Sequence, residues 1–193
     1  MIAIIKYNAG NIRSVQNALN RLGYDSIISD NSDEIRGADK VIFPGVGEAA
    51  SAMNYLKNHD LDQLIGSLTQ PILGICLGLQ LMCQHSEEGN TPCLGIFDSH
   101  VKKFPSKDKV PHIGWNNFST LKGTLFNGVQ AKNDVYYVHS YYTEIGKHTI
   151  AECNYILPFS AAMQKDNFYA TQFHPEKSAD VGEVILKNFL TGG

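Results

Sequence analysis

The chain has 193 residues, of which 43% are hydrophobic and 18% are charged, and its formal net charge is −3. This composition is typical of a folded globule, and the length fits one domain that spans residues 1–193. The slight acidic excess argues against a nucleic-acid-binding surface. No apolar run is long enough to span a membrane, and the N-terminus lacks the features of a signal peptide. We therefore expect a cytoplasmic protein.

The N-terminal half alternates short apolar runs with segments of helical period. The apolar runs predict strands over residues 2–7, 24–28, 40–43 and 71–75. Helical spacing predicts helices over residues 12–22, 49–57 and 77–84, the first of them ended by Gly23. Regular strand–helix alternation predicts parallel strands covered by helices on both faces.

The C-terminal half has shorter strands separated by turns. We expect strands over residues 101–104, 135–139, 149–154, 160–164 and 169–173, with residues 165–167 joining the last two as a hairpin. Asp180 and Glu183 resemble a capping box that starts a final helix, whose apolar face holds Val181, Val184, Ile185 and Phe189. The expected fold is a three-layer, flavodoxin-like α/β fold, with a mostly parallel central sheet and an antiparallel extension.

The four cysteines are Cys76, Cys83, Cys93 and Cys153, and no two of them form a C-x-x-C pair. Their spacing argues against a structural zinc site, and a reducing cytoplasm argues against disulfides. We therefore expect no metal. Three of the four are interpreted as small buried hydrophobic residues. Cys76 is different because of its neighbours.

Cys76 stands in Gly74-Ile75-Cys76-Leu77-Gly78, between an expected strand and an expected helix. This is the context of a nucleophile elbow, a sharp turn that presents a nucleophile at a helix start. Bulk at Gly74 or Gly78 would clash in such a turn. The helix N-terminus favours a thiolate, and the Leu77 N–H would point to where an oxyanion forms. The alternative is a buried cysteine on a glycine-rich turn.

A cysteine nucleophile needs a base, and Phe173-His174-Pro175-Glu176 supplies a candidate at the end of the last expected strand. On an extended chain, residues two apart point to the same side, so His174 and Glu176 can act together. His174 would accept the thiol proton and pass it to a leaving amine, while Glu176 orients the imidazole. The alternative is an ordinary surface turn.

The turn Pro44-Gly45-Val46-Gly47 also follows a strand end, where sites in open parallel sheets lie. Glycines on both sides of Val46 would let a peptide plane rotate and direct an N–H toward a substrate oxygen. Taken alone, this segment favours an ordinary glycine-rich turn between a strand and a helix.

The order Cys76, His174, Glu176 within one α/β domain resembles the class I glutamine amidotransferases. Four further segments narrow the resemblance to the glutaminase subunits of imidazole glycerol phosphate synthase: residues 7–15, 44–47, 111–116 and 138–142. The resemblance covers about residues 2–189. One departure is Lys6-Tyr7-Asn8, where the family commonly has Asp-Tyr-Gly.

The resemblance implies a role for each matching position. Cys76 would attack the side-chain amide of glutamine and form a thioester, and no cofactor would be needed. The oxyanion would be held by the Leu77 N–H and by a flipped peptide around Val46–Gly47. Gln80 would bind glutamine, and the backbone at Ser140 and Tyr141 would contact its amino-acid end.

The resemblance also implies a partner, a separate (β/α)₈-barrel cyclase subunit that receives the ammonia in histidine biosynthesis. The partner interface would include Asn11, Trp115 and Asn116. No phosphate-binding loop for a nucleotide is recognisable in this chain. We expect low glutaminase activity until the partner docks. The alternatives are a glutaminase for another ammonia-using synthase, a γ-glutamyl hydrolase, and a binding subunit that has lost catalysis.

Overall fold

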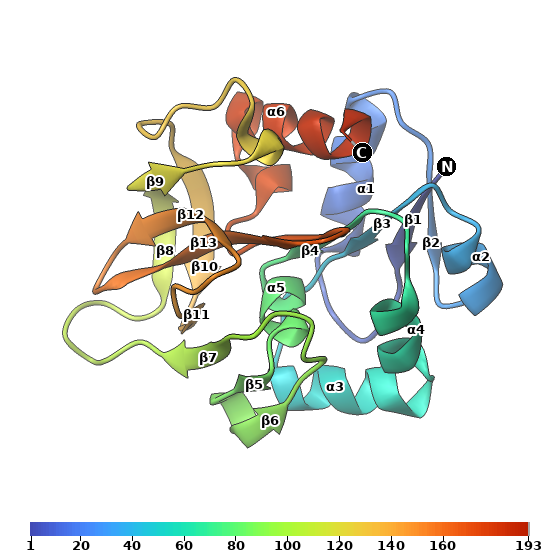
Figure 1. The fold of residues 1–193 in the computed structure, drawn as a ribbon, viewed down its shortest axis with the longest axis horizontal. Helices are drawn as coiled ribbons and strands as arrows, with labels where there is room; N and C mark the ends of the chain where they lie inside the picture. The colour runs from blue at the N-terminus through green and yellow to red at the C-terminus, as the bar shows by residue number, and fades with distance from the viewer. Residues whose placement is uncertain (193) are drawn as a thin grey trace.

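A central eight-stranded sheet runs through the computed structural model, which describes residues 1–192 (Figure 1). Strands β2, β1, β3, β4 and β14 are parallel neighbours, and β13, β12 and β9 extend the sheet antiparallel. The mostly parallel sheet with an antiparallel extension is as predicted. In sheet order the strands are Ser26–Ser29, Ile2–Ile5, Lys40–Phe43, Ile72–Ile75, Phe168–Thr171, Pro158–Lys165, Thr149–Asn154 and Thr120–Leu121.

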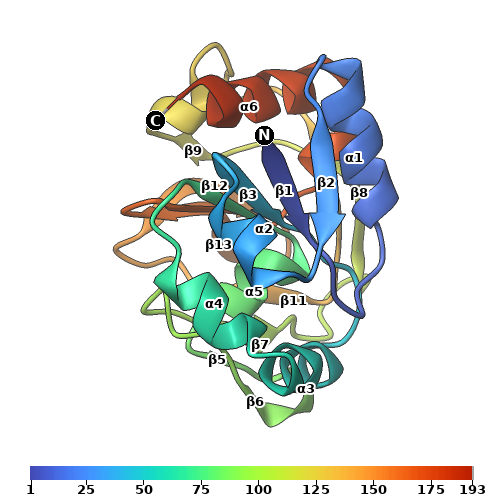
Figure 2. The same cartoon turned by 90° about the vertical axis from the view of Figure 1, so that its right-hand side faces the viewer.

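Helices cover both faces of this sheet because its strands are apolar on both sides. Along β1, Ile2 and Ile4 join one hydrophobic cluster, while Ala3 and Ile5 join the other. Figures 1 and 2 show α1 and α6 together on one face, with α3, α4 and α5 on the other. The helices are α1 (Ile12–Arg21), α2 (Ser32–Arg36), α3 (Ala49–Asn58), α4 (Leu61–Ser67), α5 (Leu77–Met82) and α6 (Ala179–Thr191). Within residues 1–192, no helix combines the length and apolar character needed to cross a bilayer.

Two smaller sheets stand beside the central one. Strand β10 (Val135–His139) pairs antiparallel with β8 (His112–Asn116), so that His139 lies opposite His112. The backbone N–H of His174 donates to the Tyr136 carbonyl, which joins β10 to the segment after β14. The other sheet has the order β11 (Tyr141–Thr143), β7 (His100–Lys103), β5 (His85–Ser86) and β6 (Thr91–Pro92).

Two local predictions are wrong. Helix α6 begins at Ala179 with Ser178 as its N-cap, so Asp180 lies inside the first turn and is not a capping residue. The buried face of α6 includes Ile185 and Phe189, as expected, but also Gly182, Leu186 and Leu190. The chain after His174 is not extended either, because Pro175–Lys177 forms a 3₁₀ turn (η3).

Candidate active site

Cys76 occupies the sharp turn between β4 and α5. Its backbone has φ +54° and ψ −105°, a conformation that few non-glycine residues adopt. A Cβ on Gly78 would overlap the Phe43 carbonyl oxygen, and a Cβ on Gly74 would lie 3.0 Å from the Gly78 carbonyl carbon. The strained elbow and the need for both glycines are as predicted.

His174 and Glu176 form a buried pair beside the elbow. The distance from His174 Nδ1 to Glu176 Oε1 is 2.7 Å, and both side chains are fully buried. Burial alone would lower the pKa of His174, but Cys76 and Glu176 outweigh it and raise the pKa to about 10. His174 Nε2 is buried and lacks a hydrogen-bond partner. It is therefore the nitrogen left to exchange a proton with Cys76. The 3₁₀ turn brings the two residues together in place of the predicted extended chain.

Asn11 restrains this pair from the opposite end of the chain. It is the N-cap residue of α1 with a left-handed φ of +72°, yet its side chain caps no helical N–H. Its amide nitrogen instead donates to Glu176 Oε1 and lies 3.4 Å from His174 Nδ1. Asn11, which we expected at a partner interface, thus contacts the His174–Glu176 pair directly.

The turn after β3 faces the elbow through its backbone. The Leu77 N–H donates to the Gly45 carbonyl oxygen over 3.2 Å, and the Gly10 N–H donates to the Val46 carbonyl oxygen over 3.1 Å. The Tyr7 hydroxyl holds the Pro44 carbonyl at 2.6 Å. The peptide that faces Leu77 is therefore Gly45–Val46, one position before the expected one. In this arrangement the Leu77 donor is occupied.

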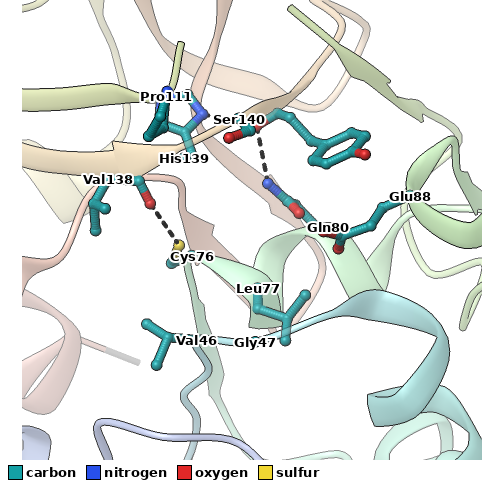
Figure 3. Close-up of a pocket in the computed structure, with 11 residues that line it drawn as sticks. Val46, Gly47, Cys76, Leu77, Gln80, Glu88, Pro111, Val138, His139 and Ser140 are labelled. Atoms are coloured by element: carbon teal, nitrogen blue, oxygen red, sulfur yellow. Dashed lines mark hydrogen bonds between the residues drawn. The ribbon is translucent and has the colours of Figure 1, made fainter.

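A cavity of about 310 Å³ opens at Cys76. Gln80 points toward it from α5 and is only 5% exposed, which excludes a solvated surface glutamine (Figure 3). Its amide nitrogen donates to the Tyr141 carbonyl oxygen at 3.0 Å and to Gln172 Oε1 at 3.1 Å. The Gln172 amide lies 3.7 Å from Cys76 Sγ. The cavity is lined by Val46, Gly47, Cys76, Leu77, Gln80, Glu88, Pro111, Val138, His139, Ser140 and Tyr141.

Glu88 is the charged residue on the cavity wall. Its carboxylate accepts a hydrogen bond from the Ala49 N–H at 2.9 Å, and burial raises its pKa. A half-buried carboxylate in a pocket suits a ligand with a positively charged group. No group of three or more His, Cys, Asp or Glu side chains in residues 1–192 is placed to hold a metal ion.

Exposed apolar side chains gather on β8. Trp115 and Ile113 are 55% and 56% exposed, and the Trp115 ring packs edge-on against Tyr136 with centroids 5.9 Å apart. The Lys177 ammonium group lies over the Tyr136 ring, 6.0 Å from its centroid. Asn116 turns away from this surface, and its amide donates to the Asn154 carbonyl.

Comparison with known proteins shows which family the chain is similar to. The family model for glutamine amidotransferase class-I matches residues 3–192. The chain is 60% identical over 192 residues to "Imidazole glycerol phosphate synthase subunit HisH" of Bacteroides fragilis (strain YCH46), covering 98% of both chains. It is 46% identical to the protein of the same name from Shewanella loihica, covering 97% of this chain and 88% of that one.

The chain belongs to the class I glutamine amidotransferases, and among them to the HisH family. The expected enzyme class is thereby confirmed, as is the expected family, the glutaminase subunits of imidazole glycerol phosphate synthase in histidine biosynthesis. A solved structure of a putative GMP synthase protein from Thermoplasma acidophilum has a TM-score of 0.76 at 23% identity. The alignment covers 98% of this chain and 92% of that one, which shows that the two share a fold.

The surroundings of Cys76 also include Glu88 and Gln172, for which the sequence predicted no role. Glu88 lies in a 3₁₀ turn (η1, Glu88–Asn90) with no recognisable periodicity before it. Gln172 stands two residues before His174 in the same short segment, but its contact with Gln80 spans 92 residues. Pro111 and His139, which lie in the segments 111–116 and 138–142 that carry the resemblance, also line the cavity.

Proposed function

We propose that this chain hydrolyses glutamine to glutamate and ammonia through a thioester on Cys76. The observation that carries the proposal is the strained Cys76 at the mouth of the cavity, coupled to the buried His174–Glu176 pair. Cys76 Sγ attacks the side-chain amide carbon after its thiol proton has passed to His174 Nε2, and His174 then gives this proton to the amide nitrogen, so that the C–N bond breaks and ammonia leaves. His174 then takes a proton from water, whose oxygen attacks the thioester and releases glutamate.

The negative oxygen of each tetrahedral intermediate needs N–H donors close to the nucleophile. The Leu77 N–H is one donor, and it is held by the Gly45 carbonyl in this structure. Rotation of the Gly45–Val46 peptide plane would free it and bring in the Val46 N–H, while the Val46–Gly47 backbone closes the cavity wall. We therefore propose that the resting chain is a weak glutaminase.

The amino-acid end of glutamine fits the opposite wall of the cavity. The Glu88 carboxylate would pair with the α-ammonium group. The backbone around Ser140 and Tyr141 offers polar contacts, with Gln80 holding the Tyr141 carbonyl in place. A ligand lacking the charged amino group should therefore bind poorly.

The relatives' name, a subunit of imidazole glycerol phosphate synthase, supports a partner chain. We propose that a barrel-shaped cyclase subunit docks over the exposed face around Trp115, with Asn11 and Asn116 close to its edge, and receives the ammonia. Trp115 offers the exposed aromatic anchor typical of such interfaces. Docking would rotate the Gly45–Val46 peptide. The single domain of residues 1–193 and its cytoplasmic location stay predictions.

The test compares two ways of feeding the complex of both subunits. Cys76→Ala should abolish glutamine-dependent product formation, by at least about 10³-fold, because the nucleophile is lost. Product formation from added ammonium salts should persist, because the cyclase chemistry lies on the partner. Unchanged glutamine-dependent synthesis would refute the proposal. Ammonia release without the cyclase at the full rate would instead favour a γ-glutamyl hydrolase or a glutaminase serving another synthase.

A further inference from the structure

Two buried histidines other than His174 face each other, one on β8 and one on β10. His112 and His139 are 3% and 5% exposed, and His112 Nδ1 lies 3.0 Å from His139 Nε2. The His112 ring is stacked between Tyr137 and Tyr155, with centroids 4.8 and 4.0 Å away. The proposed mechanism gives neither histidine a proton to carry, so their burial and mutual contact need another explanation.

The inner end of this pair fixes the position of one proton. His139 Nδ1 lies 2.7 Å from the carbonyl oxygen of Tyr141, which can only accept a hydrogen bond. His139 Nδ1 therefore carries hydrogen. Burial lowers the pKa of His139 to about 3 and that of His112 to about 4, so both rings are neutral at pH 7. Nε2 of neutral His139 is then an acceptor, and His112 Nδ1–H is its donor.

The hydrogen bonds around Asn116, at the other end of the histidine pair, independently give the same donor-to-acceptor direction. The Asn116 side-chain oxygen accepts from the Asn117 N–H at 2.8 Å, and its nitrogen donates to the Asn154 carbonyl at 3.0 Å. These two contacts orient the amide. The Asn116 amide nitrogen lies 3.4 Å from His112 Nε2 and directs its second hydrogen at it, so that ring nitrogen must accept. In each hydrogen bond from Asn116 through His112 and His139 to the Tyr141 carbonyl, the donor is therefore the group on the Asn116 side.

The Tyr141 carbonyl joins this chain of hydrogen bonds to the glutamine pocket. It also accepts from Gln80, whose second amide hydrogen goes to Gln172, and the Gln172 amide reaches toward Cys76 Sγ. The carbonyl is thus held from one side by the histidine pair and from the other by Gln80. Displacing this carbonyl would shift Gln80 and Gln172, which lie beside Cys76.

We propose that His139 and His112 are positioning residues of the glutaminase site, a neutral relay that fixes the Tyr141 carbonyl and, through it, Gln80 and Gln172 beside Cys76. This inference rests on the proposed function, because it defines their role relative to a glutamine bound at Cys76. The relay begins at Asn116, next to the exposed Trp115.

The test uses two alkylating probes on the purified chain. A chloroketone analogue of glutamine needs the pocket to reach Cys76, whereas iodoacetamide needs only the thiol. In both reactions a sulfur–carbon bond forms, the halide leaves and the thiol proton is released. The measured quantity is the ratio of the two alkylation rates, which reports pocket geometry separately from thiol reactivity.

His139→Gln removes the donor at the Nδ1 position and should lower this ratio about tenfold, as expected for one lost buried hydrogen bond. His139→Asn keeps a donor near that position and should recover most of the ratio. Thr149→Val is the control. It removes a buried hydroxyl bonded to Ser160 and Gly146, away from the cavity, and should leave the ratio unchanged.

A second variant should reverse the donor-to-acceptor direction of these hydrogen bonds by changing Asn116. Asn116→Asp places a carboxylate oxygen where the amide donor faces His112 Nε2. His112 must then carry hydrogen on Nε2, and the ratio should fall although Asn116 does not line the cavity. In the unmodified chain, ¹⁵N NMR at pH 7 should show both imidazoles neutral with hydrogen on Nδ1.

The inference is overturned if His139→Gln keeps the ratio of the Thr149→Val control, or if either imidazole is cationic or carries hydrogen on Nε2 at pH 7. Failure of the proposed function looks different. In that case iodoacetamide labels Cys76 in the unmodified chain but the chloroketone does not, and the NMR result still decides whether the relay exists.

Discussion

The backbone N–H of Leu77 donates a hydrogen bond to the carbonyl oxygen of Gly45, 3.2 Å away. In the proposed mechanism the Leu77 N–H stabilises the oxyanion, so this donor is occupied by the same turn that would supply the second donor. The next peptide plane is held separately, because the Gly10 N–H binds the Val46 carbonyl. We therefore propose that only the Gly45–Val46 peptide plane rotates when the Leu77 N–H is freed.

Gly45→Ala should damage both stability and glutaminase activity. A Cβ at this position would overlap the Tyr7 hydroxyl and lie 3.0 Å from the Leu77 Cβ. Overpacking of this kind costs about 1–3 kcal/mol, which chemical denaturation can measure. Gly66→Ala in α4 is the matched control. It meets no atom within 4 Å, and it should stabilise the chain by up to about 1 kcal/mol. Equal effects of the two variants would contradict the prediction.

Glu176→Gln should reduce glutamine turnover in the complex about 10²- to 10⁴-fold. The variant keeps an oxygen opposite His174 Nδ1 but removes the negative charge that helps to raise the pKa of His174. Glu183→Gln on α6, which faces Arg21 at the surface, should leave turnover unchanged. Ammonium-dependent synthesis should survive in both variants. If Glu176→Gln turns over glutamine normally, the carboxylate has no catalytic role.

The raised pKa of His174 predicts a loss of stability at high pH. The unfolded imidazole titrates near 6.5, whereas the folded one titrates near 10. The stabilisation is therefore complete below pH 6.5 and is lost as the pH rises through 10. The free energy of unfolding should fall by up to about 1.4 kcal/mol per pH unit over this range, more steeply than in His174→Asn. An NMR titration that places His174 near 6.5 would refute this.

The histidine pair predicts the opposite trend at low pH. Because burial lowers the pKa of His112 and His139, the unfolded chain binds protons below pH 6.5 that the folded chain does not. The contribution of these two histidines to stability is therefore complete above pH 6.5 and declines as the pH falls toward 4. Each histidine contributes up to about 1.4 kcal/mol per pH unit. His112→Asn should flatten this decline, measured by urea unfolding at several pH values, and an unchanged slope would contradict the assignment.

Glu88→Gln should raise KM for glutamine about 10- to 100-fold with a smaller change in kcat. Gln can still accept from the Ala49 N–H but lacks the charge that would pair with the α-ammonium group. Glu87→Gln is the neighbouring control, since the Glu87 carboxylate faces the Lys103 N–H. A rise in KM of the same size in the control would exclude a specific role for Glu88.

The sequence allowed some elements to be predicted to the residue and others not at all. Strands β3, β10 and β12 match their predicted ranges, because their apolar or alternating patterns end at clear turns. Helices α2 and α4 were missed, because five and seven residues carry too little periodicity. The Asp180 capping box failed because Ser178, two residues earlier, is the N-cap.

The candidate site divides in the same way. The sharp turn at Cys76 leaves no space for a side chain at Gly74 or Gly78, so the elbow can be predicted from five consecutive residues. The contact between Gln80 and the Tyr141 carbonyl joins residues 61 positions apart, and only the folded sheet order creates it. Glu88 likewise gains its place in the cavity from packing against α3.

The contact between Gly78 and the Phe43 carbonyl constrains how this enzyme can be switched on. A Cβ on Gly78 would overlap the carbonyl oxygen of Phe43, so the end of β3 packs directly against the first turn of α5 and the turn beginning at Pro44 lies beside Cys76. Activation can then be torsional and need not loosen the fold. In the proposed mechanism such a switch leaves the packing of the fold unchanged, so any rise in the melting temperature of this subunit on docking should come from the binding of the partner itself.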